Sequence, residues 1–139
     1  MDWDLIAAKL ESLRRSAERI AGKTPPSSQE LAQNADLQDI IALNLQRAVQ
    51  LSVDVASHLF ADTDIAPPST MAEHFDALNR LQVISPALAD WLKKAVGFRN
   101  LAVHSYQATD WNIVYQVCIC HLGDFRQFAK AVTTWRAAP

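Results

Sequence analysis

"LQDIIALNLQRAVQLSVDVASHLF", residues 37 to 60, is the stretch that decides the fold. Its apolar residues recur at spacings of three and four, which is the pattern of one face of an α-helix; they are Leu37, Ile41, Leu45, Ala48, Leu51, Val55 and Leu59. Ile40, Leu43 and Val49 broaden that face, so we expect this helix to contact more than one neighbour. Ser27 and Glu30 have the spacing of a capping box, and the helix is therefore expected to run from about Ser27 to about Phe60.

Four further segments show helical periodicity and end signals. One runs from about Asp2 to Gly22, a second begins at Thr70, a third runs from Ser85 to Arg99, and the last runs from Asp110 to the C-terminus. Gly22 with Pro25-Pro26, the Thr70–Glu73 pair and the Ser85-Pro86 pair are typical helix boundaries. Short connections and the lack of a strand pattern predict an all-α, five-helix up-and-down bundle that forms a single domain over residues 1–139.

The composition and net charge of the chain argue against several classes of function. Half of the 139 residues are hydrophobic and only three are glycine, which suits a packed helical core and disfavours a glycine-rich phosphate loop. A formal net charge of −2 argues against a nucleic-acid surface that covers much of the molecule, so any such contact is expected in a local patch or in one assembled by oligomerisation. The acidic start MDWD, the lack of a long apolar run and the presence of only two cysteines predict a cytoplasmic location, without a secretion signal, membrane span or disulfide framework.

One short segment, "GFRNLAVHSY" at residues 97 to 106, collects candidate chemical groups. Arg99 and His104 are five residues apart, and five residues of ideal helix rotate by about 500°, which leaves the two side chains about 140° apart. They converge only if the helix ends between them or if two copies of the segment face each other. The alternative is structural: Arg99 is then a cation at a helix C-terminus, His104 a cap or surface histidine, and Tyr106 a half-buried packing residue.

The segment "FRNLAVHSY" resembles the Arg-(polar)-x3-His-x-Tyr motif of the HepT-like toxins, within the HEPN superfamily of helical RNA-cleaving domains. "LQDIIALNLQRAVQLSVDVASHLF" and "WNIVYQVCICHLGDFRQFAKAV" are similar to further helices of that family, so the likeness covers nearly the whole chain. The resemblance implies a homodimer whose two motifs meet in a cleft. It also implies metal-independent RNA cleavage by Arg99 and His104, supported by Asn100, and silencing by an MntA-like nucleotidyltransferase antitoxin that adds AMP to Tyr106. One departure is Ser105, where many relatives carry an acidic residue.

These residue types suit the implied chemistry. RNA is cleaved without metal when its 2′-hydroxyl attacks the adjacent phosphate, and histidine is the side chain that exchanges protons near neutral pH. Arginine offers a permanently charged fork of donors for the phosphoryl oxygens. We therefore expect no cofactor, no metal, and neither DNA nor a membrane as partner. The rival hypothesis is a non-catalytic helical module that serves as the partner or substrate-presenting subunit of a nucleotidyltransferase.

Other polar residues are expected to be structural. His58, His74 and His121 lack metal-ligand spacing, and His121 falls on an apolar stripe. Cys118 and Cys120 point to different sides of a helix and are interpreted as buried small residues. Arg14-Arg15 and Lys93-Lys94 are interpreted as solvated faces, and the alternative for Lys93 or Lys94 is a place at the border of an RNA cleft.

Overall fold

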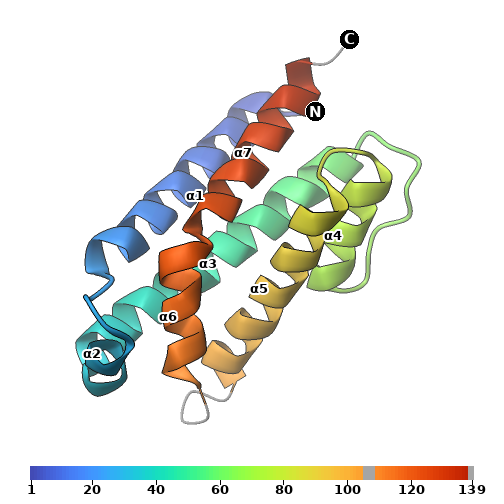
Figure 1. Ribbon diagram of the computed structural model, residues 1–139. Helices are drawn as coiled ribbons and strands as arrows, with labels where there is room; N and C mark the ends of the chain where they lie inside the picture. The colour runs from blue at the N-terminus through green and yellow to red at the C-terminus, as the bar shows by residue number, and fades with distance from the viewer. Residues whose placement is uncertain (105–108, 138–139) are drawn as a thin grey trace.

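The computed structural model describes residues 1–104 and 109–137, with residues 101–104 and 137 described by their backbone alone. Within these residues it contains seven α-helices and no strand (Figure 1). They are α1 Trp3–Lys23, α2 Ser28–Gln33, α3 Ala35–Phe60, α4 Met71–Arg80, α5 Pro86–His104, α6 Trp111–Cys120 and α7 Leu122–Ala137. The all-α prediction is confirmed. The prediction of five helices is wrong for the described residues, because two of the expected helices are each interrupted.

The first interruption divides the long second helix at Asn34. Its backbone is extended (φ −121°, ψ 100°), and its side-chain oxygen accepts a hydrogen bond from the Leu37 amide at 3.1 Å, which caps the start of α3. Gln38 then donates from Nε2 to the carbonyls of Leu31 and Ala32, at 2.9 and 3.0 Å. These bonds satisfy carbonyls at the end of α2, so the chain turns there with little loss of hydrogen bonding.

The second interruption lies at His121, between α6 and α7. The backbone leaves the helical region there (φ −123°, ψ 0°), while Nδ1 of the His121 imidazole donates a hydrogen bond to the Asp124 carboxylate at 2.8 Å. The same ring stacks on Trp91 of α5, with ring centroids 5.2 Å apart and planes 19° apart. The contact with α5 therefore stabilises the break between α6 and α7. His121 packs against a neighbouring helix, as the sequence indicated.

The centre of the molecule is α3, which packs along α1 on one side and against α4 and α5 on the other (Figure 1). Lys9 of α1 pairs with Asp54 of α3 at 3.7 Å, and the amino group of Met1 pairs with Asp62 just beyond α3 at 2.8 Å. These pairs fix α1 and α3 as antiparallel neighbours. In Figure 1 the connection over residues 61–70 runs back along the molecule, so α3 and α4 point the same way and the strict up-and-down order is not kept.

The helix ends follow the local signals in the sequence. The Ser27 and Thr70 hydroxyls accept from the amides of Glu30 and Glu73, both at 3.2 Å, and the Ser85 hydroxyl accepts from Leu88 at 3.1 Å. The first helix passes Gly22 and ends one residue later, at Lys23. Short-range capping therefore defines where most of the helices begin.

The buried aromatic pair Phe75–Phe128 joins α4 to α7 through an edge-to-face contact, with ring centroids 6.3 Å apart. Both side chains are fully buried. Replacing Phe128 with alanine leaves a cavity in the core, and we expect it to lower the free energy of unfolding by about 3–5 kcal/mol. Urea denaturation at fixed protein concentration measures this. The control is Leu5→Ala on the 39% exposed Leu5, expected within about 0.5 kcal/mol of wild type; equal midpoints for the two variants would contradict the packing.

Candidate active site

The motif segment lies on the last turns of α5. This helix continues through Arg99 and Asn100 to His104 without a break, so the expectation that it ends near Arg99 is wrong. The segment from Phe98 to His104 contains no proline or glycine that would stop it. Tyr106, the expected AMP acceptor, lies outside the described residues, as does Ser105.

Because α5 is continuous, one of the two ways in which Arg99 and His104 could meet, a helix end between them, is excluded. At 100° per residue the two positions are about 140° apart around α5, so the helix does not bring them together within one chain. The remaining way is that two copies of the segment face each other. The helix itself therefore favours a site shared between two chains.

Arg99 is half-buried, and its guanidinium is only partly satisfied. Its Nη1 donates to the side-chain oxygen of Asn100 at 3.0 Å, which joins two residues of the predicted site. Its Nε is buried and has no hydrogen-bond partner among the residues that the structure describes. A buried N–H donor without a partner costs free energy, roughly 1–3 kcal/mol. Such an arrangement leaves a permanently charged donor available to an anionic group.

The body of α5 anchors this end firmly. Leu92, Ala95 and Val96 are buried in the core, and Phe98 packs against it. About three turns before the end of α5, Lys93 donates to Asp76 of α4 at 2.9 Å, and that hydrogen bond raises the pKa of the Lys93 ammonium. Core packing therefore anchors the backbone that carries Arg99. Lys93 links α5 to α4.

The helix that follows the motif, α6, has an unusual composition. WNIVYQVCIC at residues 111–120 contains no charged residue. One face, made of Asn112, Ile113, Gln116, Ile119 and Cys120, is nevertheless exposed, with Ile113 at 44% and Ile119 at 53%. Exposed faces of monomeric proteins are usually rich in charge, whereas the centres of protein–protein interfaces are depleted in it. The outer face of α6, defined by those five residues, has the character of a contact surface next to the motif.

The remaining candidate groups have structural roles. His74 of α4 forms hydrogen bonds from both ring nitrogens, to the Thr70 carbonyl at 2.6 Å and to the Ser57 hydroxyl at 3.1 Å. Burial raises the pKa of the Cys118 thiol to about 11, which keeps it protonated and unreactive, while Cys120 is exposed against expectation. Across residues 1–104 and 109–137 there is no group of three histidine, cysteine or acidic residues that could hold a metal ion.

Sequence reasoning found the motif but missed two surfaces. The outer face of α6 could have been found from its lack of charge, since ten residues without Asp, Glu, Lys or Arg stand out in a chain with 20% charged residues. The other surface combines Arg15 and Arg19 with Arg47 of another helix, and no signal within one segment shows that α1 and α3 bring them together. No described helix is long and apolar enough to cross a membrane.

Comparison with known proteins shows the family to which the chain belongs. The sequence profile of the family described as Ribonuclease HepT-like matches residues 10–132. The mRNA nuclease HepT of Shewanella oneidensis is 36% identical over 129 residues, which cover 93% of this chain and 96% of that protein. The tRNA nuclease HepT of Aphanizomenon flos-aquae is 23% identical over 131 residues, which cover 94% of this chain and 89% of that protein. A solved structure of a tri-AMPylated HEPN toxin of Shewanella oneidensis in complex with MNT antitoxin aligns with a TM-score of 0.89 at 36% identity, covering 96% of this chain and 99% of that one.

Proposed function

Because the chain belongs to the Ribonuclease HepT-like family, we propose that it is the toxin of a toxin–antitoxin pair, an endoribonuclease that cuts RNA without a metal ion. It acts as a cytoplasmic homodimer of single-domain chains. A nucleotidyltransferase antitoxin silences it by adding AMP to Tyr106. The support comes from a nuclease that is 36% identical over nearly the whole chain and from the similar AMPylated toxin in complex with its antitoxin.

The proposed reaction is transesterification within the RNA strand. The 2′-oxygen forms a bond to phosphorus, the bond from phosphorus to the 5′-oxygen breaks, and the products are a 2′,3′-cyclic phosphate and a 5′-hydroxyl. A base takes the proton of the 2′-hydroxyl, and an acid gives a proton to the departing 5′-oxygen. His104 of each of the two chains fills one of these roles, since histidine can do either near neutral pH.

Arg99 supports the same step by charge. The phosphoryl oxygens become more negative in the transition state, and a fixed guanidinium stabilises that charge without having to reorganise. The buried Nε of Arg99, which has no partner among the described residues, is the observation that carries the proposal. Asn100 accepts from Nη1 and thereby holds the guanidinium in place, with Nε left to meet the phosphate.

Two features of the described chain support the proposed homodimer. The unbroken α5 separates Arg99 from His104 around the helix, so a complete site needs a second motif. The outer face of α6 supplies an uncharged, partly apolar surface directly after the motif in sequence. A second copy that covers this face would place the two motif segments near each other.

The rival hypothesis, a non-catalytic partner subunit of a nucleotidyltransferase, also involves a dimer and an antitoxin. Only catalysis separates the two. Growth arrest on expression of the chain alone, relieved by His104→Ala, favours the toxin, whereas the absence of both RNA cleavage and growth arrest favours the rival.

We expect His104→Ala to lower the rate of RNA cleavage by at least about 10²-fold, because it removes the proton-transfer group. Arg99→Ala is expected to lower it by about 10²–10³-fold through lost charge stabilisation, and Asn100→Ala by less. Cleavage of a labelled RNA with EDTA present measures both activity and metal independence. His58→Ala, at a half-buried histidine of α3, is the matched control and keeps full activity. A strict need for a divalent metal, or full activity of His104→Ala, would contradict the mechanism.

Tyr106→Phe removes the proposed AMP acceptor. In the modification the tyrosine oxygen bonds to the α-phosphorus of ATP, pyrophosphate leaves and the hydroxyl proton is released. We expect the variant to cleave RNA but to gain no AMP when incubated with ATP and the nucleotidyltransferase, as measured by intact mass. Tyr115→Phe is the control, because the Tyr115 hydroxyl already donates to the Pro25 carbonyl at 3.1 Å. Undiminished AMP addition to Tyr106→Phe places the acceptor elsewhere.

Ile119→Lys adds a charge to the outer face of α6, where burial against a second copy would leave that charge unpaired. We expect light scattering to show a shift from dimer towards monomer, by at least about tenfold in the dissociation constant, with a parallel loss of cleavage. Leu5→Lys, at a similarly exposed leucine of α1, is the control and stays dimeric. A fully dimeric Ile119→Lys chain with full activity shows that another surface forms the dimer.

A further inference from the structure

A second surface on the molecule, the groove between α1 and α3, is lined by basic side chains. It has a volume of about 650 Å³ and lies between Ser12, Arg15, Ser16 and Arg19 of α1 and a series on α3, namely Ile40, Leu43, Asn44, Arg47, Gln50, Leu51 and Asp54. Three arginines and one aspartate are the charged residues among these. We call it the α1–α3 groove. In a chain with a net charge of −2, it concentrates positive charge in one place.

The arginines of the groove are available to a ligand. Arg19 and Arg47 are exposed and form no ion pair within the described part of the chain. Asp54, the one acid in the lining, accepts from Gln50 at 3.0 Å and pairs with Lys9 at 3.7 Å. The charge of Asp54 therefore acts on residues at the end of the groove that lies away from Arg19. The guanidinium groups of Arg19 and Arg47 are left without a carboxylate partner among the described residues.

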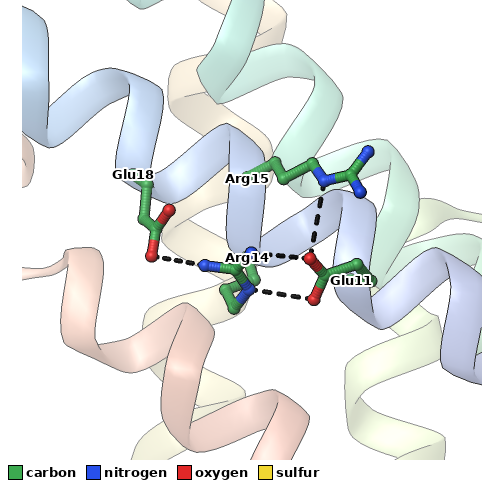
Figure 2. Close-up of polar contacts among 4 residues, drawn as sticks. All are labelled: Glu11, Arg14, Arg15 and Glu18. Atoms are coloured by element: carbon green, nitrogen blue, oxygen red, sulfur yellow. Dashed lines mark hydrogen bonds and ion pairs between the residues drawn. The ribbon is translucent and has the colours of Figure 1, made fainter.

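The contacts of Arg15 differ sharply from those of its neighbour Arg14 (Figure 2). Arg14 lies between two carboxylates, with Nη2 2.6 Å from Glu11 and Nη1 2.5 Å from Glu18, so each of its three nitrogens already donates to a carboxylate. These contacts keep Glu11 ionised, since the hydrogen bond from Arg14 lowers the pKa of that carboxyl to about 2. Arg15 meets the same Glu11 only through Nε, at 3.4 Å, and its side chain is 73% exposed. Figure 2 shows its terminal nitrogens extending away from Arg14, and they are free to contact an anion.

The basic surface continues towards the end of the bundle that carries the motif. Arg15, Arg19 and Lys23 follow each other at four-residue intervals on α1, so they share one side of that helix at steps of about 6 Å. Beyond Lys23, the Tyr115 hydroxyl of α6 donates to the Pro25 carbonyl and ties this end of α1 to the helix that follows the motif. In Figure 1 the last turns of α1 and α5 and the start of α6 lie towards the same end of the molecule.

We propose that the α1–α3 groove, through Arg15, Arg19 and Arg47, binds the phosphodiester backbone of the RNA substrate outside the site of cleavage. This rests on the proposed ribonuclease function. Arginine is well suited to phosphate, because its fork of donors matches the phosphate oxygens and its charge is permanent. No aromatic side chain is among the groove's lining residues, so the groove offers no platform for base stacking. Binding here is therefore electrostatic, independent of sequence and sensitive to salt.

A protein partner fits this groove less well than RNA. The centres of protein–protein interfaces are depleted in charged residues, and the outer face of α6 has that character whereas the α1–α3 groove does not. Dispersed, exposed arginines along the groove, two on α1 and one on α3, match a flexible polyanion, whose backbone can follow the groove.

The test replaces the three arginines together, as Arg15→Gln/Arg19→Gln/Arg47→Gln. Affinity for a labelled single-stranded RNA is measured by fluorescence anisotropy in a His104→Ala background, which prevents cleavage. We expect the dissociation constant to rise by at least tenfold at low salt, and the slope of its logarithm against the logarithm of salt concentration to fall by about 2, the loss of three phosphate contacts. In chains with His104 intact, KM rises while kcat at saturating RNA is unchanged.

The control removes equal charge elsewhere, as Arg80→Gln/Arg126→Gln/Lys130→Gln at three exposed sites of α4 and α7. It keeps near wild-type affinity and slope. Circular dichroism and light scattering establish that both triple variants keep the fold and the wild-type oligomeric state.

Equal RNA affinity and equal KM in the two triple variants overturn the proposal. If the wild-type chain still cleaves RNA in that case, the ribonuclease function stands. Loss of antitoxin binding with unchanged RNA affinity also overturns it, since the groove is then a protein contact. A wild-type chain that neither binds nor cleaves RNA overturns the ribonuclease function and this groove with it.

Discussion

The burial of α3 on more than one side is the constraint on which the rest of the structure depends. Eleven of its 26 residues are buried, including Asn44 and Ser52, which is more than a single stripe facing one neighbour supplies. Other helices must therefore pack on several sides of it, with α1 along one and α4 and α5 along another. The polar side that remains, with Arg47 and Asp54, faces the edge of α1 and forms one wall of the α1–α3 groove. Core packing thus determines where the basic surface lies.

The geometry of α5 determines in the same way where the residues of the proposed site lie. A helix rotates by about 100° per residue, and α5 keeps this rotation through His104 because nothing in its last turns stops it. Arg99 is consequently half-buried, its Nε has no partner among the described residues, and its position lies on a different side of the helix from that of His104. The two groups of the proposed site therefore do not converge within one chain, and under the proposed function only an assembled pair of chains would be active.

The sequence predicts features that depend on neighbouring residues and misses those that depend on distant ones. Helix starts at Ser27, Thr70 and Ser85 were predictable because a cap is formed by residues three positions apart. The breaks at Asn34 and His121 were missed. The first is completed by Gln38 reaching back to α2, and the second by stacking on Trp91 of α5. At the candidate site, the motif predicts roles for Arg99 and Asn100, and the structure joins these two side chains by a hydrogen bond, but the periodicity of the apolar residues did not reveal that the helix continues to His104.

Net charge illustrates the same limit at the level of the surface. An overall charge of −2 argues against nucleic-acid binding only if charges are spread evenly, and here they are not. Glu18 pairs with Arg14 and Asp76 pairs with Lys93, so these acids act on cations outside the groove, while Glu11 is shared between Arg14 and Arg15. Arg19 and Arg47 have no such acid beside them among the described residues. Which charges pair depends on which helices are neighbours. In this acidic protein the pairing leaves the α1–α3 groove suited to a polyanion. The outer face of α6 carries no charge at all.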